Sequence, residues 1–224
     1  MTRLSRRAFI ASGVAVAAAS AGCSSSGGGE TTESTEYDSI AETATPSDEQ
    51  PLPTPVAGDP DADVTVAAYS DYACPHCATY SVEVFPKLAS EYLESGTVRY
   101  EFRDFPIPVD QTVSWQAASA ARAVQAEAGT QAFYEYSEAL FRDQSNLGSE
   151  RYASLADEVG VDGDLVRQAA TEREYDPTVR ADKQAGEDRG VSGTPTVFVD
   201  GSQVEWQEIA YEPVRDAIEA ARSG

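Results

Sequence analysis

Residues 69–80 read YSDYACPHCATY and place Cys74 and Cys77, two of the three cysteines of the chain, around a proline and its single histidine. The residues VTVAAY, at 64–69, are apolar and rich in valine, which is typical of a buried strand. After the second cysteine, apolar side chains recur at helical spacing, at Val84, Leu88 and Tyr92. The pattern therefore predicts a strand, a short turn and a helix, with Cys74 at the N-terminus of the helix.

Two prolines fit this helix. Pro75 falls in the first turn, where its missing N–H would have had no partner. Pro86 is expected to kink the helix without ending it, because the apolar repeat continues to Leu93.

The close spacing of the two cysteines distinguishes between a structural disulfide, a metal site, a haem attachment site and a redox pair. As a structural cross-link, a loop of about four residues contributes roughly 2 kcal/mol, against roughly 4.7 kcal/mol for a hundred-residue loop. A structural zinc site needs four ligands, and His76 is the only histidine of the chain. Haem attachment needs a histidine directly after the second cysteine, where this chain has Ala78. Reversible thiol–disulfide chemistry remains, and no metal or organic cofactor is expected.

The helix N-terminus assigns different roles to the two sulfurs. Unpaired backbone N–H groups and the positive end of the helix dipole favour a thiolate, and a protonated His76 would add a second positive charge. Cys74 is therefore predicted to be an acidic, exposed thiol, and Cys77 to resolve the mixed disulfides that it forms. The simpler alternative for His76 is a solvent-exposed histidine without a role.

The chain is strongly acidic. Sixteen Lys and Arg against 38 Asp and Glu give a formal net charge of −22 over 224 residues. Such a surface repels phosphates, which excludes nucleic acid and makes an anionic membrane surface a poor electrostatic partner. Lysine occurs only at Lys87 and Lys183, and this lysine-poor, acid-rich composition resembles that of halophilic proteins. An ordinary acidic globular protein is the alternative.

The first residues have the pattern of an export signal. Residues 1–22 combine a basic start, a short apolar run and a small-residue end, which predicts a signal peptide. SRRAF resembles the twin-arginine signal, in which Arg6 and Arg7 direct a folded protein to its own translocase. SAGC resembles a lipobox, in which Cys23 becomes the lipid-bearing first residue; simple cleavage and secretion is the alternative. Residues 23–58 lack apolar periodicity and are expected to form a disordered tether.

The remaining segments continue the pattern of strands and helices. Alternating residues at 98–103 predict a strand, and helical patterns broken by Gly, Asp and Pro predict several short helices from about 112 to 189. Residues 196–199 predict a buried strand, followed by a turn at Asp200-Gly201 and a second strand. EPVRDAIEAAR, at 212–222, predicts a closing helix.

CPHC at the start of a helix after a buried strand resembles the DsbA-like thioredoxin-fold disulfide oxidoreductases, over residues 59–224. The segments RDFP and AFYEYSEALF are also similar to that family. The resemblance implies an α/β thioredoxin fold with an inserted helical domain at about 112–189. It also implies that Thr194-Pro195 is the family's cis-proline pair, with Pro195 beside Cys74 and the Thr194 backbone binding an extended substrate segment as an added strand.

Two residues depart from the pattern of the best-known oxidases of this family. Those proteins carry Val before the cis-proline, where Thr194 is more similar to the disulfide isomerases. Ala68 also stands in the strand where those oxidases have a buried acidic residue that assists proton transfer. The oxidising direction is therefore less firmly implied than the thiol–disulfide chemistry.

These patterns together predict an exported thiol–disulfide oxidoreductase, anchored through lipid on Cys23 to the outer face of the cell membrane. Its active site would hold the redox-active pair Cys74 and Cys77, with Pro75 and His76 between them. The substrates would be thiols of exported proteins, oxidised by the chain, and an unidentified membrane or extracytoplasmic redox partner would regenerate the pair. A reductase or isomerase of the same fold and a non-catalytic, client-binding lipoprotein remain as alternatives.

Overall fold

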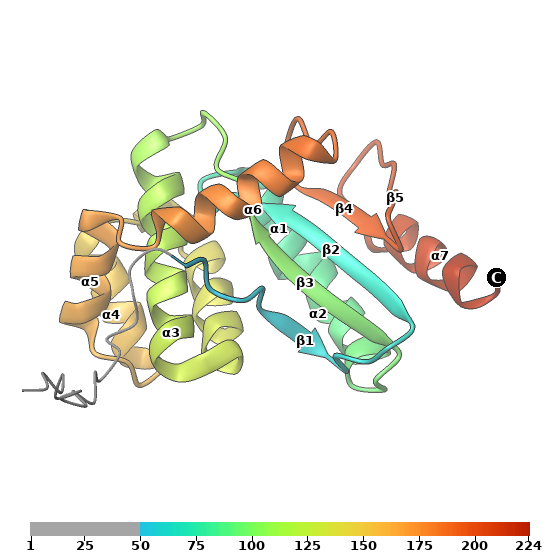
Figure 1. The fold of residues 1–224 in the computed structure, drawn as a ribbon, viewed down its shortest axis with the longest axis horizontal. Coiled ribbons are helices and arrows are strands. Elements are labelled where there is room, and N and C mark those ends of the chain that lie inside the picture. The colour runs from blue at the N-terminus through green and yellow to red at the C-terminus, as the bar shows by residue number, and fades with distance from the viewer. Residues whose placement is uncertain (1–49) are drawn as a thin grey trace, which may run out of the picture. The chain divides into compact units, whose positions relative to one another are not determined.

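The computed structural model describes residues 50–224, so the expected signal peptide, Arg6, Arg7 and Cys23 lie outside the described residues. A five-stranded sheet in the order β1-β3-β2-β4-β5 forms the centre of this part of the chain (Figure 1). The strands are β1 (Val56–Gly58), β2 (Val64–Ser70), β3 (Val98–Asp104), β4 (Thr196–Val199) and β5 (Ser202–Gln203). β2 and β3 are parallel, and the other neighbouring pairs are antiparallel.

The predicted helix after the cysteine turn runs from residue 75 to residue 93. It consists of α1 (Pro75–Thr79), the π-helical turn η1 (Tyr80–Val84), α2 (Phe85–Leu88) and a second π-helical turn η2 (Ala89–Leu93). The N–H of Phe85 bonds to the carbonyl of Tyr80, five residues earlier. Pro86 has no N–H to donate, and the wider turn lies directly before it. The expectation that the helix continues past Pro86 is confirmed.

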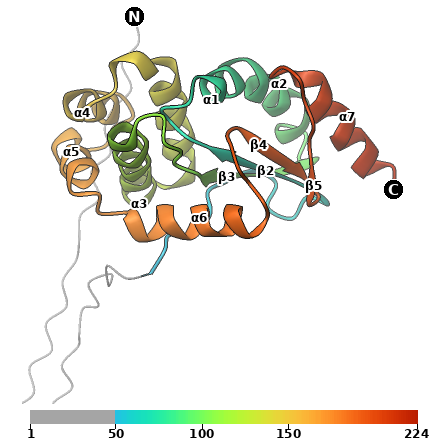
Figure 2. The same ribbon diagram turned by 90° about the horizontal axis from the view of Figure 1, so that it is seen from above.

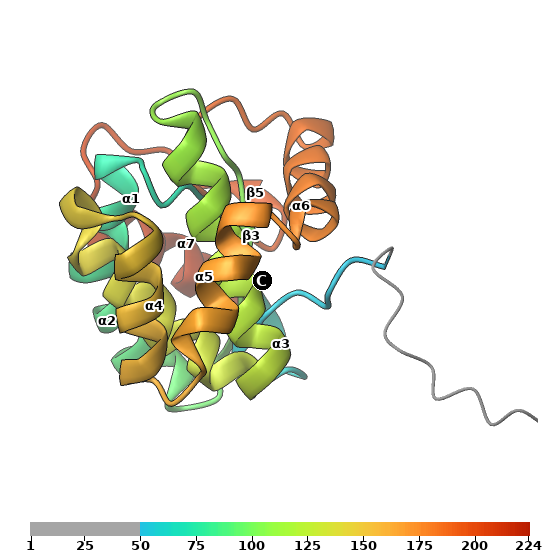
Figure 3. The same cartoon turned by 90° about the vertical axis from the view of Figure 1, so that its left-hand side faces the viewer.

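Helices cover both faces of the sheet. Figure 2 shows α1, α2 and α7 on one face and α6 on the other. The remaining helices stand beside the sheet and pack against one another, as Figure 3 shows for α3, α4 and α5. The bounds are α3 (Gln111–Arg142), the 3₁₀ turn η3 (Gln144–Asn146), α4 (Ser149–Glu158), α5 (Gly163–Glu172), α6 (Asp176–Asp188) and α7 (Tyr211–Arg222).

The helical insertion between β3 and β4 confirms the predicted run of helices. Asp110 caps α3 by accepting hydrogen bonds from the N–H groups of Thr112 and Val113. Gly129 interrupts α3 with a φ of 83°, a conformation that glycine adopts without steric cost. None of the helices within residues 50–224 is both long and apolar enough to cross a membrane.

The expected tether ends earlier than residue 58. β1 pairs with residues 99–101 of β3, so residues 56–58 belong to the sheet. Gln125 donates to the Pro53 carbonyl at 2.8 Å, and Tyr134 donates to the Pro55 carbonyl at 2.9 Å. A three-residue edge strand between prolines carries no periodicity, and these long-range hydrogen bonds are what order it. The boundary predicted at residue 58 is therefore wrong; residues 23–49 of the expected tether lie outside the described part.

The helix α6 lies close against the sheet because of Gly186. A Cβ at this position would come within 2.7 Å of the Phe105 ring and 2.9 Å of the Tyr69 ring. Tyr69 and Phe105 form a small core on this face of the sheet, together with Val191 and Phe198. The absence of a side chain at Gly186 thus sets the distance between α6 and the strands.

A buried ionic cluster joins the insertion to the sheet. Arg122 on α3 has no exposed surface and donates to Asp104, at the end of β3, at 2.6 Å. It also donates to Asp182 on α6 and to Gln125. Asp182 in turn accepts a hydrogen bond from the backbone N–H of Asp104 at 3.2 Å. One guanidinium therefore connects α3, α6 and β3.

The ionic cluster generates a stability prediction. Arg122→Met should lower the free energy of unfolding by about 3–5 kcal/mol, because it leaves the buried Asp104 carboxylate without its cation, while Asp182 keeps its ion pair with Arg103. Arg142→Met is the matched control, since Arg142 pairs with Glu138 on the exposed surface and should cost less than about 1 kcal/mol. Urea unfolding of both variants measures the difference, and equal losses would contradict a buried role for Arg122.

Candidate active site

The turn between β2 and α1 ends at Cys74, and Cys77 lies in α1 itself. The N–H of Cys74 donates to the Asp71 carbonyl at 3.0 Å, which closes the turn. Cys74 has an extended backbone, with a φ of −83° and a ψ of 120°, and is the N-cap of α1. Pro75 takes the first position of the helix. The predicted place of Cys74 at a helix N-terminus is confirmed.

Cys74 is not the exposed thiol that the sequence predicts. Its residue surface is only 3% exposed, and its Sγ donates to the carbonyl of Thr194 at 3.3 Å. The Thr194-Pro195 bond is cis, which confirms that prediction. Residue spacing along α1 does not reveal this cover, because Thr194 is 120 residues away in the sequence.

Cys77 lies one turn further along and is fully buried. Its N–H donates to the Cys74 carbonyl at 3.0 Å. Its Sγ accepts a hydrogen bond from the backbone N–H of Asp71 at 3.4 Å. Both cysteines are free thiols in this structure, so the pair is in its dithiol form.

The environment lowers the pKa of Cys74 from 9.0 to about 5. The largest cause is a hydrogen bond from the side chain of Cys77, and burial opposes it by penalising the charged sulfur. The Thr194 side chain and the backbone N–H groups of Cys77 and His76 lower this pKa further. The Thr194 hydroxyl is buried and has no partner among the described residues while both sulfurs are thiols, so it is available to donate to a thiolate.

The pKa of Cys77 moves in the opposite direction. Burial raises it well above its ordinary value, and the hydrogen bond and negative charge of Cys74 raise it further. At neutral pH the pair therefore holds one thiolate, on Cys74, and one proton, on Cys77. This is the arrangement in which one sulfur can react while the other resolves.

Pro75 and His76 are exposed at the start of α1. The contribution of His76 to the lowered Cys74 pKa comes from its backbone N–H, which other residues except proline could supply. The predicted role of the imidazole stays a prediction.

A groove of about 410 Å³ runs beside the cysteine turn and the cis-proline. It is lined by His76, Thr79, Thr194, Pro195, Trp206, Gln207, Glu208 and Ile209. The Trp206 ring meets the Tyr80 ring edge to face, with 5.9 Å between their centroids. Sequence reasoning missed residues 206–209, because a loop after a short strand carries no periodic signal.

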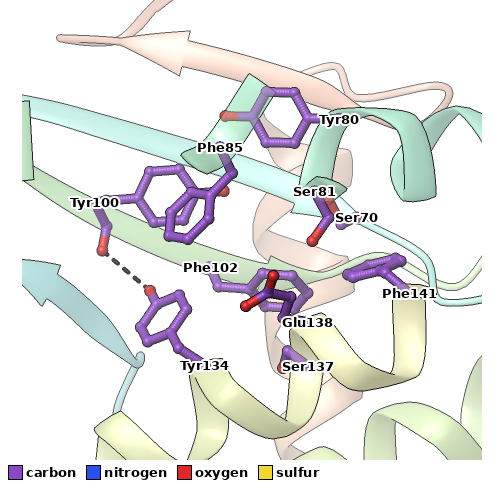
Figure 4. A pocket seen from close by; sticks show the side chains of 10 residues that line it. All are labelled: Ser70, Tyr80, Ser81, Phe85, Tyr100, Phe102, Tyr134, Ser137, Glu138 and Phe141. Carbon is purple, nitrogen blue, oxygen red and sulfur yellow. Dashed lines mark hydrogen bonds between the residues drawn. The ribbon is translucent and has the colours of Figure 1, made fainter. Parts of the chain in front are cut away.

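A second hollow lies on the other side of the helix, between η1, β3 and α3 (Figure 4). Aromatic rings from all three elements line it, and the Tyr134 hydroxyl, which donates to the Pro55 carbonyl, shares its proton with the Tyr100 carbonyl at 3.2 Å. Only about 20 Å³ is open to the centre of a water molecule. This is room for about one water, too little for a substrate side chain or an organic cofactor.

Sequence reasoning also missed Asp71, which is 2% exposed at the end of β2. Its carboxylate accepts hydrogen bonds from the N–H groups of Ala73 at 2.8 Å and Ile107 at 2.7 Å, and from the Ser114 hydroxyl at 2.9 Å. The sequence signal that could have identified Asp71 is an acidic residue directly after a buried strand. Ala68, three residues earlier, is fully buried in the sheet.

No group of three or more His, Cys, Asp or Glu side chains within residues 50–224 is arranged to hold a metal ion.

Known proteins share this sequence pattern. A family model described as Thioredoxin matches residues 51–220. Disulfide bond formation protein D of Bacillus subtilis is 25% identical over 181 residues, covering 76% of this chain and 78% of that protein. Na(+)/H(+) antiporter NhaA 3 of Salinispora tropica is 32% identical over 146 residues, covering 65% of this chain but 21% of the antiporter. The chain therefore spans about a fifth of the length of that antiporter.

Solved structures share the fold. Oxidised BdbD from Bacillus subtilis superposes with a TM-score of 0.70 at 24% identity, covering 76% of this chain and 94% of that one. DsbA from Chlamydia trachomatis gives a TM-score of 0.67 at 19% identity, covering 79% of this chain and 95% of that one. These matches confirm the predicted α/β thioredoxin fold with an inserted helical domain. The chain belongs to the thioredoxin family and has the fold of its DsbA-like members.

Proposed function

We propose that this chain is a thiol–disulfide oxidoreductase in which Cys74 and Cys77 form the redox-active pair. The observation that carries the proposal is the placement of the two sulfurs: Cys74 caps the helix beside Thr194, and Cys77 is fully buried one turn behind it, which moves their pKa values in opposite directions. A structural cross-link does not need this asymmetry, and the chemistry of exchange does.

The reaction follows from the two sulfurs. In the disulfide form, a substrate thiolate attacks the Cys74 sulfur, a new disulfide bond forms, and the bond between Cys74 and Cys77 breaks. Cys77 leaves as a thiolate and takes up a proton, because burial disfavours its charge. A second substrate thiolate then attacks the substrate sulfur of the mixed disulfide and displaces the Cys74 thiolate. The substrate loses two electrons and the cysteine pair gains them.

The groove beside the cysteine turn supports a protein substrate. Trp206 and Ile209 offer apolar surface, and Thr194, which also lines the groove, contacts the Cys74 sulfur through its carbonyl. An extended peptide could pair with the backbone of Thr194 as an added strand, which reads little of its sequence. The substrate class that fits is therefore cysteine pairs of unrelated, unfolded or flexible protein segments.

Oxidation is the direction that the Cys74 environment supports. A hydrogen-bonded thiolate stabilises the dithiol form, so the disulfide form is the stronger oxidant. The relative named disulfide bond formation protein D points the same way. Thr194 before the cis-proline favours the second candidate, a reductase or isomerase of the same fold.

The cellular location of the protein is proposed from the sequence before residue 50. Residues 1–22 would be the twin-arginine signal, Cys23 the lipid-bearing residue, and the following acidic stretch a tether that keeps the domain outside the cell membrane. Exported proteins would then be the source of substrate thiols, and a membrane or extracytoplasmic partner would reset the pair. The acidic, lysine-poor composition fits a halophilic organism.

Trapping tests the proposed function. Cys77→Ala should accumulate mixed disulfides with a client protein that carries activated disulfides, because the Cys74 thiolate displaces the activating group and no resolving sulfur releases the adduct. Cys74→Ala is the matched control and should form none, since Cys77 is fully buried. Non-reducing gels of both variants, incubated with an unfolded protein that contains activated disulfides, measure the adducts. If neither variant forms adducts, the oxidoreductase proposal fails.

The Cys74 pKa predicts how stability depends on pH. A thiol whose pKa is lowered on folding to about 5 stabilises the folded dithiol form fully above its ordinary pKa of 9.0, and this stabilisation is lost as the pH falls through 5. Between pH 5 and pH 7, the free energy of unfolding of the dithiol form should therefore rise by roughly 2 kcal/mol relative to that of the disulfide form. Urea unfolding of both forms measures this gain, and parallel pH profiles would contradict it.

The stability of the dithiol form relative to the disulfide form also sets the reduction potential of the pair. A measured potential of about −120 mV would support the oxidase, and one of about −270 mV would support the reductase.

His76→Ser tests the imidazole separately from the backbone. If the charged imidazole stabilises the thiolate, this variant should raise the Cys74 pKa by up to about one unit and make the disulfide form less oxidising. The backbone N–H at residue 76 is retained in the variant. Thr79→Ser, on the same groove wall, is the control and should leave the Cys74 titration unchanged. An unchanged reduction potential in His76→Ser would remove the imidazole from the mechanism.

A further inference from the structure

Asp71 is in contact with both halves of the cysteine pair. Its backbone carbonyl accepts the N–H of Cys74, which closes the turn, and its backbone N–H donates to the Cys77 sulfur at 3.4 Å. Its carboxylate holds the same turn through the N–H of Ala73. Movement of Asp71 would therefore displace both sulfurs.

The carboxylate also fixes this turn to the helical insertion. It accepts from the N–H of Ile107, in the loop after β3, and from the hydroxyl of Ser114, in the first turns of α3. These partners are uncharged, and no cation forms an ion pair with Asp71 within residues 50–224. The structure thus buries a carboxylate at the redox pair without neutralising it.

We propose that Asp71 is a positioning residue of the Cys74–Cys77 pair, which fixes the turn that leads into the two cysteines and opposes, through its own negative charge, the charge that reduction places on Cys74. This inference rests on the proposed role of the two cysteines as the redox pair. It assigns a buried acid to the site at Asp71, three residues after the buried Ala68.

The electrostatics agree with this geometry. Burial raises the pKa of Asp71, its three hydrogen bonds lower it, and the negative charge of Cys74 raises it again. The other titratable groups that interact with it are Cys77 on α1 and Asp104 at the end of β3. Asp104 is itself an acid and adds negative charge, and Lys183 on α6 is held by the Pro106 carbonyl and Glu187.

Removal of the charge should favour the Cys74 thiolate. In Asp71→Asn, the titration midpoint of Cys74, followed by alkylation rate against pH, should fall by about one unit, a tenfold change in its ionisation constant. The equilibrium with glutathione should shift about tenfold toward the dithiol form. Asp110→Asn is the matched control, because it removes an exposed carboxylate from the same loop, keeps a good N-cap residue, and should leave both values unchanged.

The Cys74 midpoint separates this proposal from a purely structural role. If Asp71 were only a loop anchor, Asp71→Asn would lower the thermal midpoint and leave the Cys74 titration where it was. A Cys74 midpoint that stays unchanged or rises in the folded variant would overturn the proposal.

The native protein provides a second test that does not depend on the folding of a variant. The carboxyl carbon of Asp71, followed by NMR as the pH changes, should titrate at a higher pH in the dithiol form than in the disulfide form. Equal midpoints in the two forms would overturn the proposal. Mixed-disulfide trapping with Cys77→Ala is independent of this result, so a failure of the redox pair and a failure of the Asp71 coupling are distinguishable.

Discussion

The chemistry of this site depends on the contact between the first turn of α1 and the cis Thr194-Pro195 segment. That contact buries Cys74 and still leaves the hydrogen bonds that a thiolate needs, from Cys77, Thr194 and the backbone. Burial alone would raise the Cys74 pKa, as it does at Cys77. The two buried sulfurs therefore differ in their hydrogen-bond donors, and most of these donors point to Cys74.

The helical insertion contributes to this contact although it lies beside the sheet. It connects β3 to β4, so the chain enters the Thr194 segment directly from α6. Asp182 on α6 is tied to Arg122, and Gly186 allows α6 to lie against the rings of Tyr69 and Phe105. The start of β4 therefore follows a helix, α6, whose position on the sheet is fixed by the Asp182–Arg122 ion pair and by close packing at Gly186. The ion pair is not a source of net stability by itself, but the loss of one partner is costly.

The parts of the structure that depend on neighbours in sequence could be predicted, and the parts that depend on distant residues could not. Periodicity gave the strand before Cys74, the helix past Pro86 and the helices of the insertion, and the resemblance to a family supplied the cis bond at Pro195. The burial of Cys74 was missed because its cover comes from Thr194. β1 was missed because three edge residues show no period, and Asp71 because hydrogen bonds from Ile107 and Ser114 cannot be seen in the local sequence.

The main cause of the low Cys74 pKa is not the helix N-terminus that the sequence suggested. The backbone N–H groups at the start of α1 contribute, but the largest cause is the hydrogen bond from Cys77. That donor is lost when the disulfide forms, and the charge that it stabilises is lost with it. Cys77 therefore acts twice: it is the leaving group when a substrate attacks, and once protonated it stabilises the Cys74 thiolate that is later released. The proposed effect of the Asp71 carboxylate opposes the same charge, so the oxidising strength of the pair depends on the balance between the donors at Cys77, Thr194 and the backbone and one buried acid.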